Sequence, residues 1–291
     1  MNLVVEGVLL GLMTAGVYAL MASGLTLIFG VMRVINVAQG ALVILGAYLA
    51  FNLQEFYHLD PFAAILLTTP ALFALGVGLE YAFIRPLRGN REAMSVLATF
   101  ALALGIEGVL GLLFTTNYRQ IQAWYVTASW EAAGFRFPLI YVFSFAASVI
   151  VLGLLYLLLY HSPFGRALRA LVQNRTGALL VGVDVERISA LTFGVGVATA
   201  AIGGMLFGAT NAFNPGSHYD LISRLLAIIV LGGMGSVGGA LVAAVIMLVT
   251  EDVTALVISP LWADFTFFVL LIATLVLRPR GLFGRSEREH L

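Results

Sequence analysis

The sequence predicts an all-α integral membrane protein, a polytopic bundle of about eight transmembrane segments in a single transmembrane domain covering 1–291. Of the 291 residues, 61% are hydrophobic and only 10% are charged, whereas soluble domains carry about 25% charged residues. The hydrophobic residues also gather in long runs without charges, and a spanning helix needs about 20 such residues. Most of the surface must therefore face lipid.

The expected spans are the apolar runs that lie between charged residues. In chain order they are 7–32, 34–54, 61–79, 93–118, 137–165, 188–219, 225–250 and 253–277. Two of these runs contain an acid, namely Glu107 and Asp264. Each run is long enough to cross a bilayer as a helix.

The placement of arginine predicts the orientation, because cytoplasmic loops retain basic residues. Most of the arginines lie in three segments, 85–91, 166–187 and 278–288. We therefore expect these segments on the cytoplasmic side, with the N-terminus periplasmic and the C-terminus cytoplasmic. The opposite connections carry acids and aromatic residues, and the exceptions on that side are Arg119, Arg136 and Arg224.

Residues 225–250 do not fit a single crossing, because one crossing would place Glu251 and Asp252 inside and the basic C-terminus outside. The conflict disappears if this segment enters the membrane, breaks and returns. Its middle contains five glycines in eight residues, and each costs up to ~1 kcal/mol in a helix interior. We expect two short or half helices joined at these glycines, either re-entrant or as two short spans.

Such a break marks a candidate solute pathway, since discontinuous helices near the midplane are where transporters hold their substrates. Close packing of small residues between helices is the alternative role, and the two roles are compatible. The candidate pathway residues at the break are Gly232, Gly233, Gly235 and Ser236.

Two further places are candidates for the pathway. The second span opens with two amides and a glycine, Asn36, Gln39 and Gly40. We expect Asn36 to cap this helix and to leave backbone N–H groups for a carboxylate, although capping alone is an alternative. Glu107 has apolar residues on both sides, and a carboxylate there is costly unless it is paired or hydrated. It indicates either a pathway residue or a structural hydrogen bond.

Residues 161–188 form the most informative polar segment. Ser162-Pro163 is expected to end the preceding span, and two short amphipathic helices are expected to follow, the second from 177–180. Asp184 can cap the next span. Two short helices on the cytoplasmic side suit docking to a soluble partner, whereas a basic loop on anionic headgroups is the alternative. The candidate docking residues are Arg166, Ala167, Arg169, Ala170, Gly182, Asp184 and Arg187.

Residue types that are absent exclude several chemistries. All 15 basic residues are arginine, so the chain cannot form a P-loop or a lysine Schiff base. It has no cysteine, and its four histidines lack metal-ligand spacing. We expect no catalytic residue, metal site or cofactor, and a membrane enzyme ranks last. A secondary transporter would need a cluster of buried charges, for which Glu107 and Asp264 are the candidates.

Four motifs, in the right order, resemble those of branched-chain amino-acid ABC transporter permeases. They are INVAQG at 35–40, the pair GRALRA and GVDVER at 165–170 and 182–187, LGGMGSVGGA at 231–240 and RPRGLFG at 278–284. The resemblance covers almost the whole chain. The closing motif and the modest length are more similar to the LivH-type subunit than to its LivM-type partner.

The resemblance implies a multi-pass permease of the bacterial inner membrane that imports branched-chain or other neutral amino acids. Relatives of this family import urea, amides or aromatic acids, which remain alternatives. The resemblance also implies several partners: a second, LivM-type permease, two cytoplasmic ATPase subunits that hold ATP and Mg²⁺, and a periplasmic solute-binding protein. It implies no nucleic acid. Segment 161–188 would dock on the ATPases. Asn174 stands where the family would favour an acid.

Overall fold

The computed structural model describes residues 3–87, 90–132, 135–279 and 281–283. Within these ranges, seven helices are long and apolar enough to cross a membrane, which confirms the expected all-α membrane bundle. The elements, in chain order, are α1 (Leu3–Met32), α2 (Gln39–Tyr57), α3 (Pro61–Leu79), a π-helical turn (Glu80–Ile84), α4 (Arg91–Phe114), α5 (Trp124–Thr127), β1 (Ser129–Ala132), β2 (Phe135–Pro138), α6 (Leu139–His161), α7 (Pro163–Gln173), α8 (Arg175–Leu180), α9 (Val185–Thr210), a 3-10 turn (Pro215–Ser217), α10 (His218–Gly232), α11 (Val237–Val257) and α12 (Pro260–Leu277).

Two features differ from the expected spans. The second span starts late, because the chain is not helical from Arg33 to Ala38 and α2 begins only at Gln39. The connection between α4 and α6 contains α5 and a small antiparallel hairpin, with Ser129 of β1 opposite Pro138 of β2. The sequence did not predict this hairpin, since four-residue strands are too short to show a clear alternating pattern.

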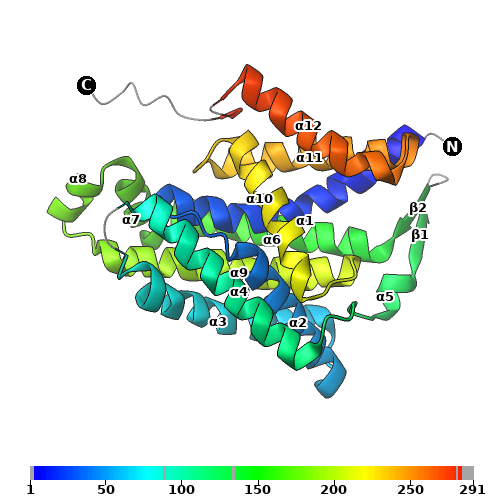
Figure 1. Ribbon diagram of the computed structural model, residues 1–291, viewed down its shortest axis with the longest axis horizontal. Coiled ribbons are helices and arrows are strands. Elements are labelled where there is room, and N and C mark those ends of the chain that lie inside the picture. The colour runs from blue at the N-terminus through cyan, green and yellow to red at the C-terminus, as the bar shows by residue number, and fades with distance from the viewer. Residues whose placement is uncertain (1–2, 88–89, 133–134, 280, 284–291) are drawn as a thin grey trace.

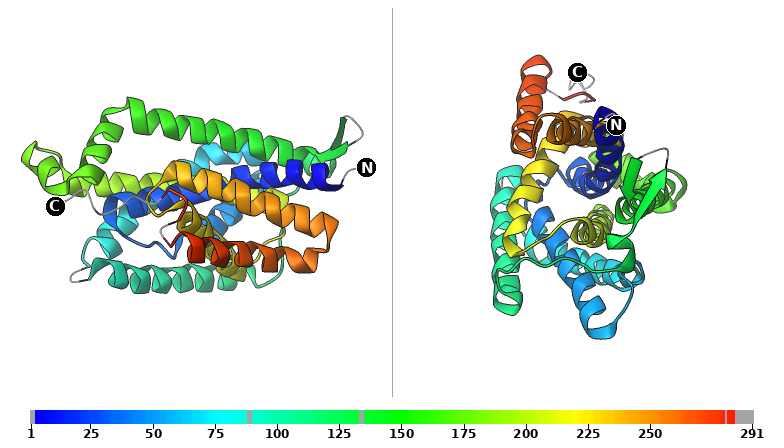
Figure 2. Two further views of the ribbon diagram at one scale, coloured as in Figure 1. Left: turned by 90° about the horizontal axis from the view of Figure 1, so that it is seen from above. Right: turned by 90° about the vertical axis from the view of Figure 1, so that its right-hand side faces the viewer.

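The described parts of the three arginine-rich segments lie toward one end of the bundle. Figures 1 and 2 show the connection from α3 to α4, helices α7 and α8, and the end of α12 at this end. The start of α1, helix α5 and the β1–β2 hairpin lie at the other end. This grouping agrees with the arginine rule, and the assignment of the first end to the cytoplasm stays a prediction.

Helix α9 is the centre of the bundle, with 83% of its spanning window buried. It packs against α1, α2 and α3, and small residues line these contacts. A methyl group at Gly204 would lie 2.1 Å from the Val43 carbonyl oxygen of α2, and one at Gly76 of α3 would lie 3.0 Å from the Gly194 Cα atom. Because lipid is as apolar as leucine, close backbone packing of this kind holds membrane helices together.

Candidate functional site: a polar cavity along α10

The expected break in 225–250 is confirmed. Helix α10 ends at Gly232, and the next turn uses two glycines with positive φ, 97° at Gly233 and 86° at Gly235. Helix α11 then starts at Val237, and the Ser236 hydroxyl caps it by accepting from the Gly239 N–H at 3.1 Å. Positive φ is accessible to glycine at little cost, so the glycines make the reversal possible.

The expected outer limit of this segment is wrong. Helix α11 continues to Val257, so Glu251 and Asp252 lie inside α11 and not in a connection between spans. The chain turns at Ile258 and Ser259, and α12 starts with proline at its first position, which is favourable because that position needs no N–H donor. The two acids are thereby held within the bundle.

Replacing Gly232 with alanine should destabilise the protein by about 1–3 kcal/mol, the usual cost of overpacking. The new methyl group would lie 2.5 Å from the carbonyl carbon of Gly239 on α11. Gly238 in the same glycine cluster has no atom within 4 Å of an added methyl group, so Gly238→Ala is the matched control. Thermal unfolding of the two detergent-solubilised variants compares them. Equal melting temperatures would contradict the tight α10–α11 contact.

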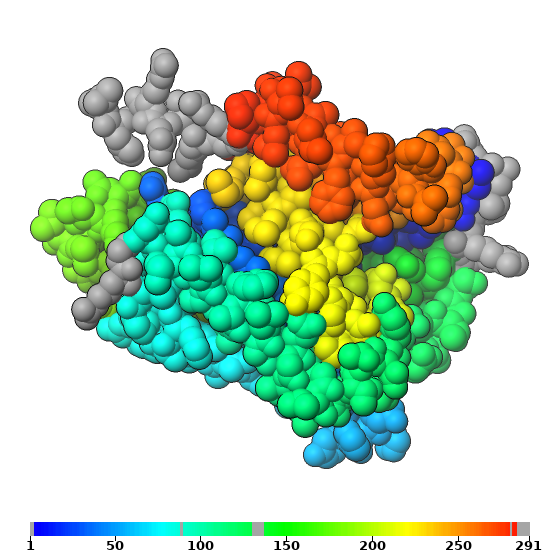
Figure 3. Space-filling view, viewed as in Figure 1, coloured from blue at the N-terminus to red at the C-terminus, as the bar shows by residue number. Residues whose placement is uncertain are grey.

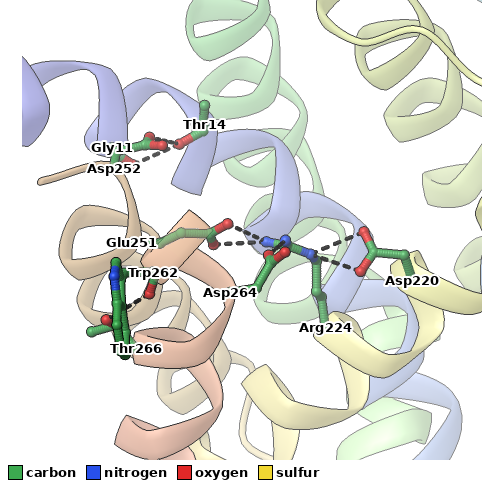
Figure 4. Close-up of polar contacts among 9 residues, drawn as sticks. All are labelled: Gly11, Thr14, Asp220, Arg224, Glu251, Asp252, Trp262, Asp264 and Thr266. Atoms are coloured by element: carbon green, nitrogen blue, oxygen red, sulfur yellow. Dashed lines mark hydrogen bonds and ion pairs between the residues drawn. The ribbon is translucent and has the colours of Figure 1, made fainter. Parts of the chain in front are cut away.

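Arg224 lies at the centre of an ion-pair cluster that joins three helices (Figure 4). Its Nη1 atom donates to both Glu251 oxygens of α11 at 2.5 and 2.7 Å, and its Nε atom donates to Asp220, one turn earlier, at 3.0 Å. Its Nη2 atom donates to Asp264 of α12. The guanidinium also lies 5.3 Å above the Phe267 ring. The sequence placed Arg224 in an external connection, whereas the structure places it inside the bundle, 9% exposed.

A cavity of about 740 Å³ lies beside this cluster, with polar walls from α1, α6, α10 and α11. Asp252 lies in its wall and accepts a hydrogen bond from the Thr14 hydroxyl at 2.8 Å. Tyr18 and Tyr141 line the same space. In the space-filling view, α10 (yellow) is exposed between α4 and α12 (Figure 3). The wall therefore combines carboxylates, hydroxyls and one guanidinium.

Glu107 of α4 holds the first turn of α10. Its Oε2 atom lies 3.1 Å from His218 Nε2 and accepts a hydrogen bond from the Tyr219 hydroxyl at 2.9 Å. Glu107 also lines a second cavity of about 350 Å³, which shares Asn214 and Gly216 with the larger one. The structural hydrogen bond expected for this acid is present, and the same side chain borders space that a solute could enter.

The expected cap at Asn36 is wrong. Ala38 is the N-cap residue of α2 and makes no side-chain cap. Asn36 instead donates to the Gln39 side chain at 3.1 Å, and Gln39 donates to the Gly196 carbonyl of α9 at 3.0 Å. Both amides are fully buried. The Gln39 amide thereby ties the start of α2 to α9, and Asn36 orients that amide.

The segment before α2 is irregular, and hydroxyls of α4 accept hydrogen bonds from its backbone. The Ile35 N–H donates to Ser95 at 3.3 Å, and the Val37 N–H donates to Thr99 at 3.0 Å. Gly40 lets the start of α2 approach α10, because a methyl group there would lie 2.5 Å from the His218 carbonyl oxygen. Irregular backbone inside a membrane bundle persists when protein groups satisfy it in this way.

The segment expected to dock on a partner folds as two short helices at the arginine-rich end. Ser162 ends α6 and caps α7, and the Asp184 carboxylate caps α9 by accepting from the Arg187 N–H at 3.0 Å. The second helix, α8, starts two residues earlier than expected, because Asn174 is its N-cap. Gly182 adopts a φ of 84° between α8 and α9. Of the candidate docking residues, the exposed ones are Arg166, Gly182, Asp184 and Arg187.

One candidate docking residue, Arg169, makes contacts within the bundle. Arg169 donates to the Leu159 carbonyl of α6, and its guanidinium lies 5.1 Å above the Tyr160 ring, so it holds α7 onto α6. The α8 tip instead presents two apolar side chains that the sequence analysis missed, Leu180 at 84% and Val181 at 78% exposure. The signal for them was an apolar pair directly before a glycine turn.

Together, the helical bundle, the broken element α10–α11, the polar cavity and the exposed short helices are typical of a multi-pass membrane permease. Among the residues that the structure describes, no group of three or more His, Cys, Asp or Glu side chains could hold a metal ion. The chain belongs to the family described as the permease component of branched-chain amino acid transport systems, whose model matches residues 7–275.

Two relatives match the chain over nearly their full length. The chain is 30% identical to the high-affinity branched-chain amino acid transport system permease protein BraD of Pseudomonas aeruginosa, covering 96% of this chain and 95% of the relative. It is 30% identical to the probable branched-chain amino acid transport permease protein LivH of Methanocaldococcus jannaschii, covering 97% and 92%. Its identity to LivM of Escherichia coli is 24%, covering 94% of this chain and 69% of LivM. No solved structure matches the chain.

Proposed function

We propose that this chain is one of two pathway subunits of an ABC importer for branched-chain or similar neutral amino acids. The names of its relatives support this class of solute, and similarity to both LivH- and LivM-type permeases supports pairing with a second permease. Separate ATPase subunits would supply the energy on the side of α7 and α8, and a solute-binding protein would deliver the amino acid at the other end.

The observation that carries this proposal is the polar face around α10. The side chains of Asp220 and Asp264 are 62% and 68% exposed on this face. Charged side chains on membrane-embedded helices avoid lipid and face a water-filled space or another protein. The face therefore fits a pathway that forms between this chain and a second permease.

The chemistry of the cavity favours a zwitterion. Its carboxylates Asp220, Glu251 and Asp252 outnumber the guanidinium of Arg224, so the wall can attract an ammonium group by charge. Hydroxyls of Thr14 and the tyrosines offer further hydrogen bonds. An uncharged urea or amide would use few of these groups, which places such solutes second.

A single cysteine at Tyr219 tests whether the cavity is open to water. The natural chain has no cysteine, so Tyr219→Cys in the assembled complex should react with a membrane-impermeant maleimide added from the periplasmic side. Leucine with its binding protein should slow the reaction. Leu112→Cys is the matched control, because Leu112 is 89% exposed on α4 and a thiol in lipid does not form the reactive thiolate. Equal labelling of both positions would contradict an aqueous pathway along α10.

Transport by the complete complex tests the class of function. Proteoliposomes that contain this chain, a second permease, the ATPases and the binding protein should accumulate leucine only with ATP. Proteoliposomes with this chain alone should accumulate none. ATP-independent uptake by the single chain would show a secondary transporter.

A further inference from the structure

Residues 281–283, which follow α12, lie against the end of α10. The Leu282 N–H donates to the Leu231 carbonyl at 2.7 Å, and the Phe283 N–H donates to the Gly232 carbonyl at 3.2 Å. These carbonyls belong to the last turn of α10, where a helix has no internal donors left. Residues that follow α12 therefore complete the end of another helix.

Gly281 makes this approach possible in two ways. Its φ is 76°, a conformation that residues with a side chain rarely adopt. An added methyl group would also lie 2.5 Å from the Val230 carbonyl oxygen and 2.8 Å from the Gly233 nitrogen. A side chain at this position would push the segment away from α10.

Helix α12 thus holds α10 at two levels. Near the start of α12, Asp264 binds the Arg224 guanidinium. Just after the end of α12, residues 282–283 bind the end of α10. The first of these points lies at the polar cavity, because Asp220 and Arg224 of α10 are part of its wall.

We propose that residues 281–283 form a main-chain clamp that fixes the end of α10 and positions the cavity-lining side chains for transport. Local capping does not replace it, because the Gly233 N–H reaches only the Val230 carbonyl, at 3.3 Å. The carbonyls of Leu231 and Gly232 take their donors from the clamp. This inference rests on the proposed function, since positioning is read out as solute uptake.

A matched pair of variants at Phe283 tests the clamp. Phe283→Pro removes the N–H that binds Gly232, because proline has none, whereas Phe283→Ala keeps this donor and trims a side chain that is 52% exposed. In the complete importer with leucine as solute, Phe283→Pro should lower the maximal uptake rate about tenfold, the scale of a lost backbone hydrogen bond with local fraying. The leucine concentration for half-maximal uptake should not change, since the binding protein sets it. Phe283→Ala should stay within about twofold.

Hydrogen–deuterium exchange of the same complexes tests the contact itself. Amides in 228–236 should exchange faster in Phe283→Pro than in Phe283→Ala, because only the first variant loses a donor. Gly281→Ala is a second disrupting variant if Phe283→Pro fails to assemble, and Gly153→Ala is its control, since an added methyl group at Gly153 meets no atom within 4 Å.

Two outcomes would overturn the clamp. Unchanged exchange in 228–236 would show that the C-terminal motif does not hold α10. Faster exchange with normal leucine uptake would show that the contact has no part in transport. Absence of uptake by the wild-type complex would count against the proposed function, and the exchange experiment would then decide on the clamp alone.

Discussion

Arg224→Gln is expected to destabilise the protein by about 3–5 kcal/mol and to abolish leucine uptake, because it leaves a buried carboxylate without its cation. The Arg224 and Glu251 side chains are only 11% and 12% exposed, so water compensates poorly for the lost guanidinium. The same change removes the link from α10 to Asp264 on α12. Thermal unfolding in detergent and uptake into membrane vesicles measure the two effects.

The double variant Arg224→Gln/Glu251→Gln distinguishes the cost of an unpaired buried charge from the cost of losing the packing of the guanidinium. Removing both charges should restore most of the stability, because no unpaired charge then remains buried. Asp220 and Asp264 are largely exposed and should add little to the cost. A double variant as unstable as Arg224→Gln would show that the fit of the guanidinium, and not its charge, holds the three helices.

Leu180→Glu/Val181→Glu is expected to abolish ATP-driven uptake while leaving the fold intact. Both side chains project from the α8 tip into solvent, so two carboxylates there should cost little stability. A buried apolar anchor in an interface contributes about 2 kcal/mol or more, and charging two anchors should release the ATPases. Co-purification of the ATPase subunits with this chain measures the loss.

Phe56→Glu is the control for this prediction. Phe56 is 73% exposed at the end of α2, at the end of the bundle away from α7 and α8. The Phe56→Glu variant should leave ATPase binding unchanged. Arg169→Ala should instead lower the melting temperature, because it frees α7 from the Leu159 carbonyl. Normal ATPase binding by Leu180→Glu/Val181→Glu would refute the α8 tip as the docking surface.

The parts of the fold that follow from apolar length and helix-breaking residues were predictable from the sequence. Gaps between charges gave most spans, and the glycine cluster gave the α10–α11 break, because both depend on local composition. The presence of the short helices α7 and α8 followed from Ser162-Pro163, which ends the preceding span by local geometry, whereas the start of α8 at Asn174 was placed two residues too late.

The charged cluster was not predictable in the same way. Arg224, Glu251 and Asp264 lie on three helices, and their meeting depends on how those helices cross. A charge rule that assigns each charge to a connection misplaced Arg224 and Glu251, because it ignores pairing inside the bundle. Asn36 was misread for a similar reason, since its amide donates to the Gln39 side chain, which in turn binds a carbonyl of another helix.

Helix α4 illustrates how such polar contacts act in a bilayer. Only 17% of its spanning window is buried, and Ser95 and Thr99 on its inner face bind backbone groups at Ile35 and Val37. Apolar contacts with neighbouring helices are easily exchanged for contacts with acyl chains, whereas hydrogen bonds are not. Two hydroxyls and the Glu107 carboxylate therefore hold α4 to the bundle more firmly than its leucines do. The exclusion of lipid from the interior at α4 depends on these polar contacts.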